Sequence, residues 1–169
     1  MKRFLLIATL FFFTPPALAS DTQTVSDTKA VSDYIRYFKR NVKPSLQRRA
    51  LKLVPLIVSI SKKYKIDPML VTIMIRFESS FVPGVVGAVL GERGLLQVHG
   101  VALKGRKLAT VADEIDAGVL YLVACQRRCK NDLWAINRYM SGRCMPVFRN
   151  PRKRYKHYLW AVEKFKNGG

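Results

Sequence analysis

The sequence predicts a mainly α-helical fold, and three observations support this prediction. Apolar residues recur at helical spacing in several segments of the chain, with charged residues between them. Residues typical of helix ends flank these segments: Asp67-Pro68 precedes one, and Gly142 follows another. No series of short segments alternates between apolar and polar residues, as the strands of a sheet would.

Residues 1–19, MKRFLLIATLFFFTPPALA, have the pattern of a secretory signal peptide. Two basic residues precede a run of 10 apolar residues, and the small-residue pattern Ala17-Leu18-Ala19 follows. The run is too short for a membrane-spanning helix, which needs about 20 apolar residues. We therefore expect export with cleavage after Ala19, which leaves a mature chain of 169 − 19 = 150 residues, the length of one ordinary domain.

The mature chain is strongly basic. The whole sequence has 30 Lys and Arg residues against 11 Asp and Glu residues, and the signal peptide contains two of the basic residues, so the mature charge is (30 − 2) − 11 = +17. This charge exceeds what solubility requires and attracts polyanions. Outside the cytoplasm these are lipid headgroups, cell-wall polymers and, less often, DNA. We expect an anionic wall or membrane surface as partner rather than nucleic acid.

The segments before the main domain are polar and then basic. Residues 20–32, SDTQTVSDTKAVS, are small and polar, so we predict a flexible leader there. A basic stretch follows from about Asp33 and suggests a short amphipathic helix. The predicted organisation is therefore a signal peptide over 1–19, a polar leader and basic segment over 20–44, and one domain over 45–169.

The first helices of the domain lead to a buried one. Apolar residues at helical spacing predict a helix near residues 53–63, which Pro55 should begin or kink. Asp67 is a typical N-cap, and Pro68 suits a first helical turn. The helix that they start should run to about Ser79. Its residues are apolar on nearly every side, so we expect it to be buried inside the domain.

Three more helices follow a glycine-bearing loop over residues 84–94. One should span Asp113 to about Arg127, with its first acids as partners of the helix dipole. Another should span Asp132 to about Ser141 and end at Gly142. The basic tail from about residue 149 should form the last helix. The acids of the helix predicted from Asp113 to about Arg127 are Asp113, Glu114 and Asp116.

The cysteines permit one disulfide bond and leave one thiol over. They are Cys125, Cys129 and Cys144, and the sequence leaves the pairing open. We expect no metal centre, because the two histidines, His99 and His157, have no ligand spacing.

Glu78 is an acid at the end of the helix that should be buried. It follows Met74 by four residues and Leu70 by eight, so it shares their face. Burial disfavours the ionised carboxylate and should raise the pKa of Glu78. A carboxylic acid that stays protonated near neutral pH can donate a proton to a glycosidic oxygen. The alternative is a helix-end glutamate that turns out to solvent.

Four motifs occur in a specific order along the chain: ESSF, GERGLLQV, EIDAGVLYL and AINRYMSG. Glu-Ser with an aromatic residue two positions on, followed some sixteen residues later by Gly-Leu-x-Gln, is the most specific part. In these motifs the chain resembles the Slt family of lytic transglycosylases, from about Leu46 to Gly142. The resemblance implies a lysozyme-like, mainly α single domain of about six to seven helices with a catalytic cleft.

The resemblance also implies roles for individual residues. Glu78 matches the single catalytic acid/base, and Ser79 matches the serine beside it that helps position the sugar or the acid. Gln97 matches a glutamine that contacts the sugar amides. Tyr139 matches a tyrosine near the catalytic carboxyl. Met140 stands where the family has an asparagine, and Asn137 is a candidate to replace that contact.

The implied activity is that of an exported, periplasmic enzyme without cofactor or metal. It would cleave peptidoglycan glycan strands between N-acetylmuramic acid and N-acetylglucosamine and close an anhydro sugar. The resemblance also suggests local wall opening for a secretion or conjugation machine. One alternative is a lysozyme-type hydrolase, which needs a second carboxylate, and Glu92 is the candidate. Another is a non-catalytic wall-binding module of an export apparatus.

Overall fold

Helices account for most of the structure, a computed structural model that describes residues 19–38, 44–87, 91–103, 105–145 and 149–167. The predicted signal peptide lies outside the described residues, apart from Ala19. Within them there are two isolated bridges but no strand, which confirms the mainly α prediction. The helices described are α1 (Ala19–Phe38), α2 (Pro44–Lys52), α3 (Val54–Tyr64), α4 (Pro68–Ser79), α5 (Gly100–Leu103), α6 (Val111–Arg128), α7 (Asp132–Ser141) and α8 (Arg149–Phe165).

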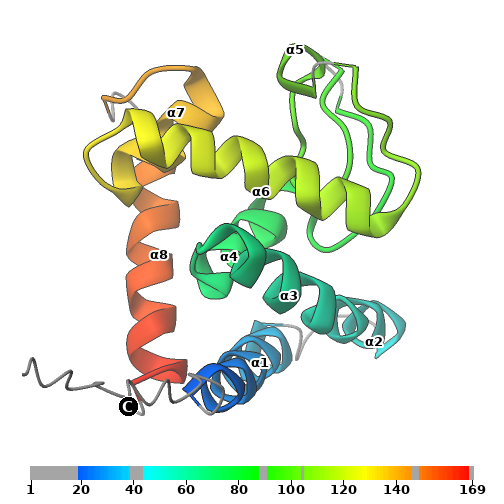
Figure 1. Ribbon diagram of the computed structural model, residues 1–169, viewed down its shortest axis with the longest axis vertical. Coiled ribbons are helices and arrows are strands. Elements are labelled where there is room, and N and C mark those ends of the chain that lie inside the picture. The colour runs from blue at the N-terminus through cyan, green and yellow to red at the C-terminus, as the bar shows by residue number, and fades with distance from the viewer. Residues whose placement is uncertain (1–18, 39–43, 88–90, 104, 146–148, 168–169) are drawn as a thin grey trace, which may run out of the picture.

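Helix α4 begins and ends where the sequence predicts, and it is buried. The Asp67 carboxylate caps its start by accepting a hydrogen bond of 2.8 Å from the backbone N–H of Met69. Every residue from Pro68 to Ile75 is buried. Figure 1 shows α4 in the middle of the molecule, and it contacts α1, α3 and α8. Burial on all sides explains why this helix has so few polar residues.

Helix α8 lies along one side of the molecule (Figure 1) and contacts α4. In the second half of α8 the Tyr158 hydroxyl donates to Asp67 over 2.8 Å, and directly after α8 the Lys166 ammonium donates to Asp67 over 3.0 Å. Near its N-terminal end, Arg154 pairs with Glu78. The two ends of α4, its cap and its last turn, are therefore both bound to α8.

The prediction of a flexible leader over residues 20–32 is wrong. These residues belong to α1, and the second half of that helix buries Ala30, Val31, Tyr34 and Ile35. This stripe packs where α1 contacts α3, α4 and α8. Its first half is polar and exposed for most of its length, and it continues a helix that the packed half anchors. The polar composition concealed one apolar stripe, which is enough to dock a helix.

The disulfide bond joins Cys129, just after α6, to Cys144, just after α7. Cys125 keeps a free thiol and is buried in the core. Both partners of the bond flank α7, so the bond closes a covalent loop around that helix. Of the pairings that the sequence left open, this one ties α7 to the end of α6.

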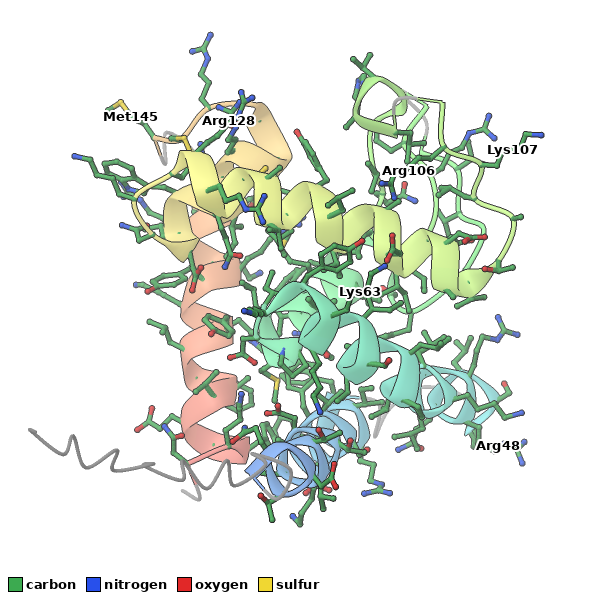
Figure 2. The ribbon with its side chains drawn as sticks, in the orientation of Figure 1. Arg48, Lys63, Arg106, Lys107, Arg128 and Met145 are labelled. Atoms are coloured by element: carbon green, nitrogen blue, oxygen red, sulfur yellow. A yellow bond between two sulfur atoms is a disulfide. The ribbon has the colours of Figure 1, made fainter. Side chains whose placement is uncertain are left out.

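The basic charge is spread over the surface. Figure 2 shows the side chains of Arg48, Lys107 and Arg128 reaching outward from three different parts of the molecule, and all three are exposed. Among the residues described, no helix is both long enough and apolar enough to cross a membrane.

Candidate active site

Glu78 occupies the last turn of α4 and forms an ion pair with Arg154 of α8. The Arg154 Nη1 donates to the Glu78 Oε1, and the two side chains are only 13% and 17% exposed. The Arg154 guanidinium also lies 5.3 Å from the centre of the Phe77 ring. The alternative of a glutamate that turns out to solvent is therefore wrong: Glu78 is largely covered and paired.

Burial and charge act on the Glu78 carboxyl in opposite directions. Burial raises its pKa and is the largest effect, the positive charge and hydrogen bond of Arg154 lower it, and the negative charge of Glu92 raises it again. The result is a pKa above the ordinary glutamate value. This is the direction that the sequence predicts, and it suits a group that must carry a proton near neutral pH.

The chain makes a strained turn directly after Glu78. Ser80 and Phe81 have φ angles of 53° and 65°, the left-handed region that residues with side chains rarely adopt. Phe81 is buried, which anchors the turn in the core. Strained backbone of this kind is held in place by packing and is common at functional sites. Ser79 is buried too, and its hydroxyl donates to the Ile75 carbonyl over 3.2 Å. Its predicted role at a sugar stays a prediction.

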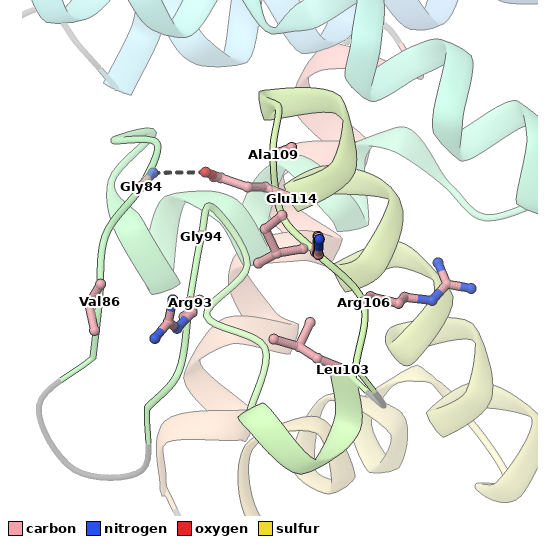
Figure 3. Close-up of a pocket in the computed structure, with 10 residues that line it drawn as sticks. Gly84, Val86, Arg93, Gly94, Leu103, Arg106, Ala109 and Glu114 are labelled. Atoms are coloured by element: carbon pink, nitrogen blue, oxygen red, sulfur yellow. Dashed lines mark hydrogen bonds between the residues drawn. The ribbon is translucent and has the colours of Figure 1, made fainter.

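Glu114 of α6 holds the loop that follows this turn. Its carboxylate accepts hydrogen bonds from the Gly84 N–H over 3.0 Å and the Leu95 N–H over 2.8 Å. The first of these is drawn in Figure 3. Gly94 lies so close that a β-carbon there would stand 2.8 Å from the Glu114 Cγ. Glu114 therefore fixes both sides of the glycine loop at once.

Of the three acids that the sequence assigns to the helix dipole, Asp113 and Glu114 lie in the first turn of α6, and Asp113 also forms a capping box with Thr110. Glu114 is buried under the loop. Asp116 accepts hydrogen bonds from Lys63, Tyr64 and Arg106. Position in the first turns of a helix explains an exposed acid, but these two side chains point to partners elsewhere in the fold.

Gln97 lies in the same loop and is bound to it through its amide nitrogen. Its Nε2 donates to the Val85 carbonyl over 2.9 Å and to the Gly94 carbonyl over 2.7 Å. The φ of Gln97 is 48°. Both amide protons are used, so a ligand can meet this side chain only through its Oε1, as a hydrogen-bond acceptor.

Gly87 allows Glu92 and Gln97 to come together on the loop. A β-carbon at position 87 would stand 2.4 Å from the Glu92 Oε2 and 3.0 Å from the Gln97 Oε1. The Gly87 N–H also donates to the Glu92 carbonyl over 2.7 Å. The two candidate polar groups of the loop therefore both lie beside the space that a side chain at position 87 would fill.

Tyr139 of α7 lies close enough to Glu78 to interact with it electrostatically. Burial raises the pKa of Tyr139 most, and the negative charge of Glu78 raises it further. Its hydroxyl donates to the Leu96 carbonyl over 2.7 Å, and its ring packs 4.9 Å from the Tyr121 ring, centre to centre. Tyr139 thus connects α7 to the residue that precedes Gln97.

Asn137 does not take over the contact of the family's asparagine, whose position Met140 occupies in this chain. Its Nδ2 donates to the Ser141 hydroxyl over 3.1 Å and to the carbonyls of Arg143 and Met145, so its amide nitrogen holds the turn after α7. It is fully buried. Met140 is half-buried and packs against the core.

A hollow of about 610 Å³ opens beside the glycine loop (Figure 3). Arg93, Arg106 and Lys107 give it a positive rim, and Glu78 is not part of its lining. Among the residues described, no group of three or more His, Cys, Asp or Glu side chains could hold a metal ion. The His99 ring accepts a bond from the Val101 N–H at 3.3 Å, a local structural role.

The structure gathers most of the predicted residues and adds two that sequence reasoning missed. Glu78 interacts electrostatically with Tyr139 and with Glu92, and Gln97 lies beside Glu92. Arg154 lies in a basic stretch of sequence, and nothing in that stretch distinguishes it from the neighbouring arginines and lysines. Glu114 could have been recognised from its position after a glycine loop and before the buried face of a helix. A role at the helix dipole also explains an acid at that position, so the sequence did not indicate its contact with the loop.

The comparison with protein-family models matches residues 55–145 to the transglycosylase SLT domain, which is more than half of the chain. Comparison with curated proteins and with solved structures gives no significant match. The matched range contains Glu78, Gln97, Glu114 and Tyr139 and ends before α8. It also confirms the family resemblance of the four sequence motifs. The chain therefore belongs to the transglycosylase SLT domain family.

Proposed function

We propose that this protein is an exported lytic transglycosylase that cleaves peptidoglycan with Glu78 as its acid and base. Membership of the SLT family supports a peptidoglycan-acting function of the lytic transglycosylase type. The observation that carries the assignment to Glu78 is its place: a largely covered carboxyl with a raised pKa, on the last turn of a buried helix. Such a carboxyl can hold a proton at a pH where an exposed glutamate has lost it.

The chemistry begins with proton donation. Protonated Glu78 gives its proton to the oxygen of the bond between N-acetylmuramic acid and N-acetylglucosamine, and the bonding electrons leave with that oxygen. The acetamido group of the muramic acid can stabilise the positive charge that develops on the sugar. Glu78, now a carboxylate, takes the proton of the muramic acid's primary hydroxyl. That oxygen bonds to the anomeric carbon, which closes the anhydro sugar and returns Glu78 to its starting state.

Three other side chains are proposed to bind the sugar. The Gln97 Oε1 is free of the bonds that its amide nitrogen makes to the loop, so it can accept from a sugar amide N–H. The Tyr139 hydroxyl donates to Leu96 and can still accept one bond. The Ser79 hydroxyl donates within α4 and likewise keeps acceptor capacity.

The proposed setting is the periplasm, with the wall or an anionic membrane surface as the adsorbing partner. The pattern of residues 1–19 and the charge of the mature chain support this part of the proposal. Service to a secretion or conjugation machine follows from the family resemblance alone.

A lysozyme-type hydrolase is the second candidate, and Glu92 is the observation that favours it. The charge of Glu92 affects the pKa of Glu78, so the two carboxyls are near one another. A hydrolase would use Glu92 as nucleophile or as the base that activates water. A transglycosylase needs no such group, so the two candidates differ in their products and in their dependence on Glu92.

Digestion of purified peptidoglycan, followed by mass spectrometry of the fragments, tests the proposal. We expect anhydro-muropeptides from the wild type, none from Glu78→Gln, and nearly the wild-type amount from Glu92→Gln. Glu163→Gln is the matched control, because Glu163 is exposed and lies outside the site. Fragments with reducing ends that disappear in Glu92→Gln would establish the hydrolase instead. Binding without any release of fragments would indicate a non-catalytic wall-binding module.

A further inference from the structure

The Arg154–Glu78 pair joins two charged groups that are both largely removed from water. Arg154 comes from α8, which lies beyond the residues that match the SLT family model. The pair therefore joins Glu78, inside the matched region, to a helix that lies outside it. An ion pair with so little exposure is stronger than a surface pair, and removing one partner leaves the other uncompensated.

Arg154 is held firmly in its place. Pro151 and Tyr158, three residues before and four residues after it, are buried, and the Tyr158 hydroxyl is bound to the cap of α4. Its guanidinium lies over the ring of Phe77, the residue next to Glu78. A planar guanidinium with these contacts presents its N–H groups in one direction, so it orients the carboxylate that accepts from it.

The charged and titratable groups that face Glu78 come from three elements. Arg154 of α8 provides the positive charge, Glu92 of the glycine loop provides a negative charge, and Tyr139 of α7 provides a neutral hydroxyl. Among these groups only Arg154 favours the carboxylate over the carboxylic acid. The pair is thus strongest when Glu78 is ionised, and a proton on Glu78 removes most of the attraction.

We propose that Arg154 is a positioning residue of the Glu78 site, which fixes the orientation of the carboxyl group and limits how far burial favours its protonated form. This inference rests on the proposed function of Glu78 as the proton donor. Its consequence is that Arg154 sets the upper pH limit of cleavage. Loss of Arg154 lets Glu78 keep its proton to higher pH, so activity should persist where the wild type has lost it.

The test compares Arg154→Gln and Arg154→Lys with the wild type across pH. An opposite charge this close lowers the pKa of a carboxyl group by about one to three units. For Arg154→Gln we expect the alkaline limb of kcat/KM to move upward by about one unit or more, while Arg154→Lys, which keeps the charge, stays near the wild type. Above that limb one unit corresponds to about a tenfold gain in protonated Glu78. Lys164→Gln is the control, because it removes the same charge from an exposed position at the other end of α8.

A second measurement separates this inference from the proposed function. NMR titration of the carboxyl carbons, with Glu78 identified by its absence in Glu78→Gln, follows its protonation in any folded variant, active or not. The chain has few glutamates to assign: Glu78, Glu92, Glu114 and Glu163. An upward shift of the Glu78 titration in Arg154→Gln supports the inference even if the wild type releases no fragments. An unchanged titration overturns it, whatever happens to activity.

Discussion

Gly118 of α6 lies against Leu96 so closely that a β-carbon at position 118 would stand 2.4 Å from the Leu96 Cβ and 2.3 Å from its Cδ1. Leu96 precedes Gln97 in the chain, and its carbonyl accepts the hydrogen bond from Tyr139. The glycine of the Asp-Ala-Gly motif therefore has a physical reason. It lets the loop of Gln97 approach α6 more closely than any other residue would allow.

Gly118→Ala should therefore disturb the site. Alanine favours a helix by about 1 kcal/mol over glycine, but overpacking a buried contact costs about 1–3 kcal/mol, so we expect a net loss of stability. Leu96 must move, and we expect a higher KM for glycan strands because Gln97 moves with it. Thermal unfolding and the kinetics of fragment release measure the two effects. Gly100→Ala is the control, since a β-carbon there meets nothing within 4 Å. Equal behaviour of the two variants would contradict the close contact.

Glu114→Ala should loosen the glycine loop. It leaves the N–H groups of Gly84 and Leu95 without their acceptor, and each such loss costs about 1–3 kcal/mol. We expect the free energy of unfolding to fall by about 2–4 kcal/mol, measured by urea denaturation, together with faster amide hydrogen exchange at Gly84 and Leu95. Asp113→Ala removes a partly exposed capping acid of the same helix and should cost about 1 kcal/mol. A smaller loss of unfolding free energy for Glu114→Ala than for Asp113→Ala would contradict the role of Glu114 in holding the loop.

Stability should fall in mild acid because of His157. The Arg76 guanidinium, which can only donate, lies 2.8 Å from its Nε2, so this nitrogen accepts and the ring is neutral. Burial, and then the charges of Arg76 and Lys153, lower the pKa of His157 to about 4. The folded pKa lies below the ordinary value of 6.5, so the unfolded chain takes up the proton first and stability declines as pH falls from about 6.5 to about 4.

The comparison of wild type with His157→Gln isolates this effect from the carboxyl groups that titrate nearby. We expect the difference in unfolding free energy between the two proteins to shrink as the pH falls through that window, because only the wild type has an imidazole to protonate. A difference that stays constant with pH would contradict a neutral, half-buried His157.

Reduction should destabilise the protein through the Cys129–Cys144 bond alone. The bond closes a loop of sequence separation 15 around α7, for which chain entropy gives about 3 kcal/mol. Urea denaturation with and without dithiothreitol measures the loss. A variant with both Cys129→Ala and Cys144→Ala should be insensitive to the reductant, whereas Cys125→Ala should stay fully sensitive. Loss of sensitivity in Cys125→Ala would point to a different pairing in solution.

Adsorption to an anionic surface should depend on the first turns of α8. Arg149, Arg152, Lys153 and Lys156 line a hollow there together with Asn150, and no acidic residue takes part in the lining. We expect a triple change of Arg149, Lys153 and Lys156 to glutamine to weaken cosedimentation with purified peptidoglycan. The matched control changes the exposed Arg48, Lys52 and Lys107 to glutamine, which removes the same charge from other elements.

Salt provides the independent check of that surface. Raising ionic strength from about 0.1 M to about 1 M shortens the Debye length from about 10 Å to about 3 Å, so binding driven by charge should decline steeply. A flat response, or equal losses in the two triple variants, would argue against adsorption through α8.

The extent to which sequence predicted this fold depends on how local the forces are. Asp67 caps α4 through the N–H of Met69, two residues away, and Gly142 ends α7 through the carbonyl of Arg138, four residues away. Such contacts depend only on residues that are close in sequence, so the sequence predicts them well. The prediction of a flexible leader over 20–32 failed for the opposite reason. The helix there is held by apolar residues from Ala30 onward and by the core against which they pack.

The sequence by itself determined the helical class, the buried helix that carries Glu78 and the order of motifs that defines the family. Only the tertiary structure decided what surrounds Glu78. Arg154 stands 76 positions away and reaches the carboxyl because α8 packs against α4, a relationship set by buried contacts along both helices. Glu114 is likewise 30 positions from the Gly84 N–H that it holds. Long-range pairs of this kind follow from how the helices pack, and packing depends on the whole chain at once.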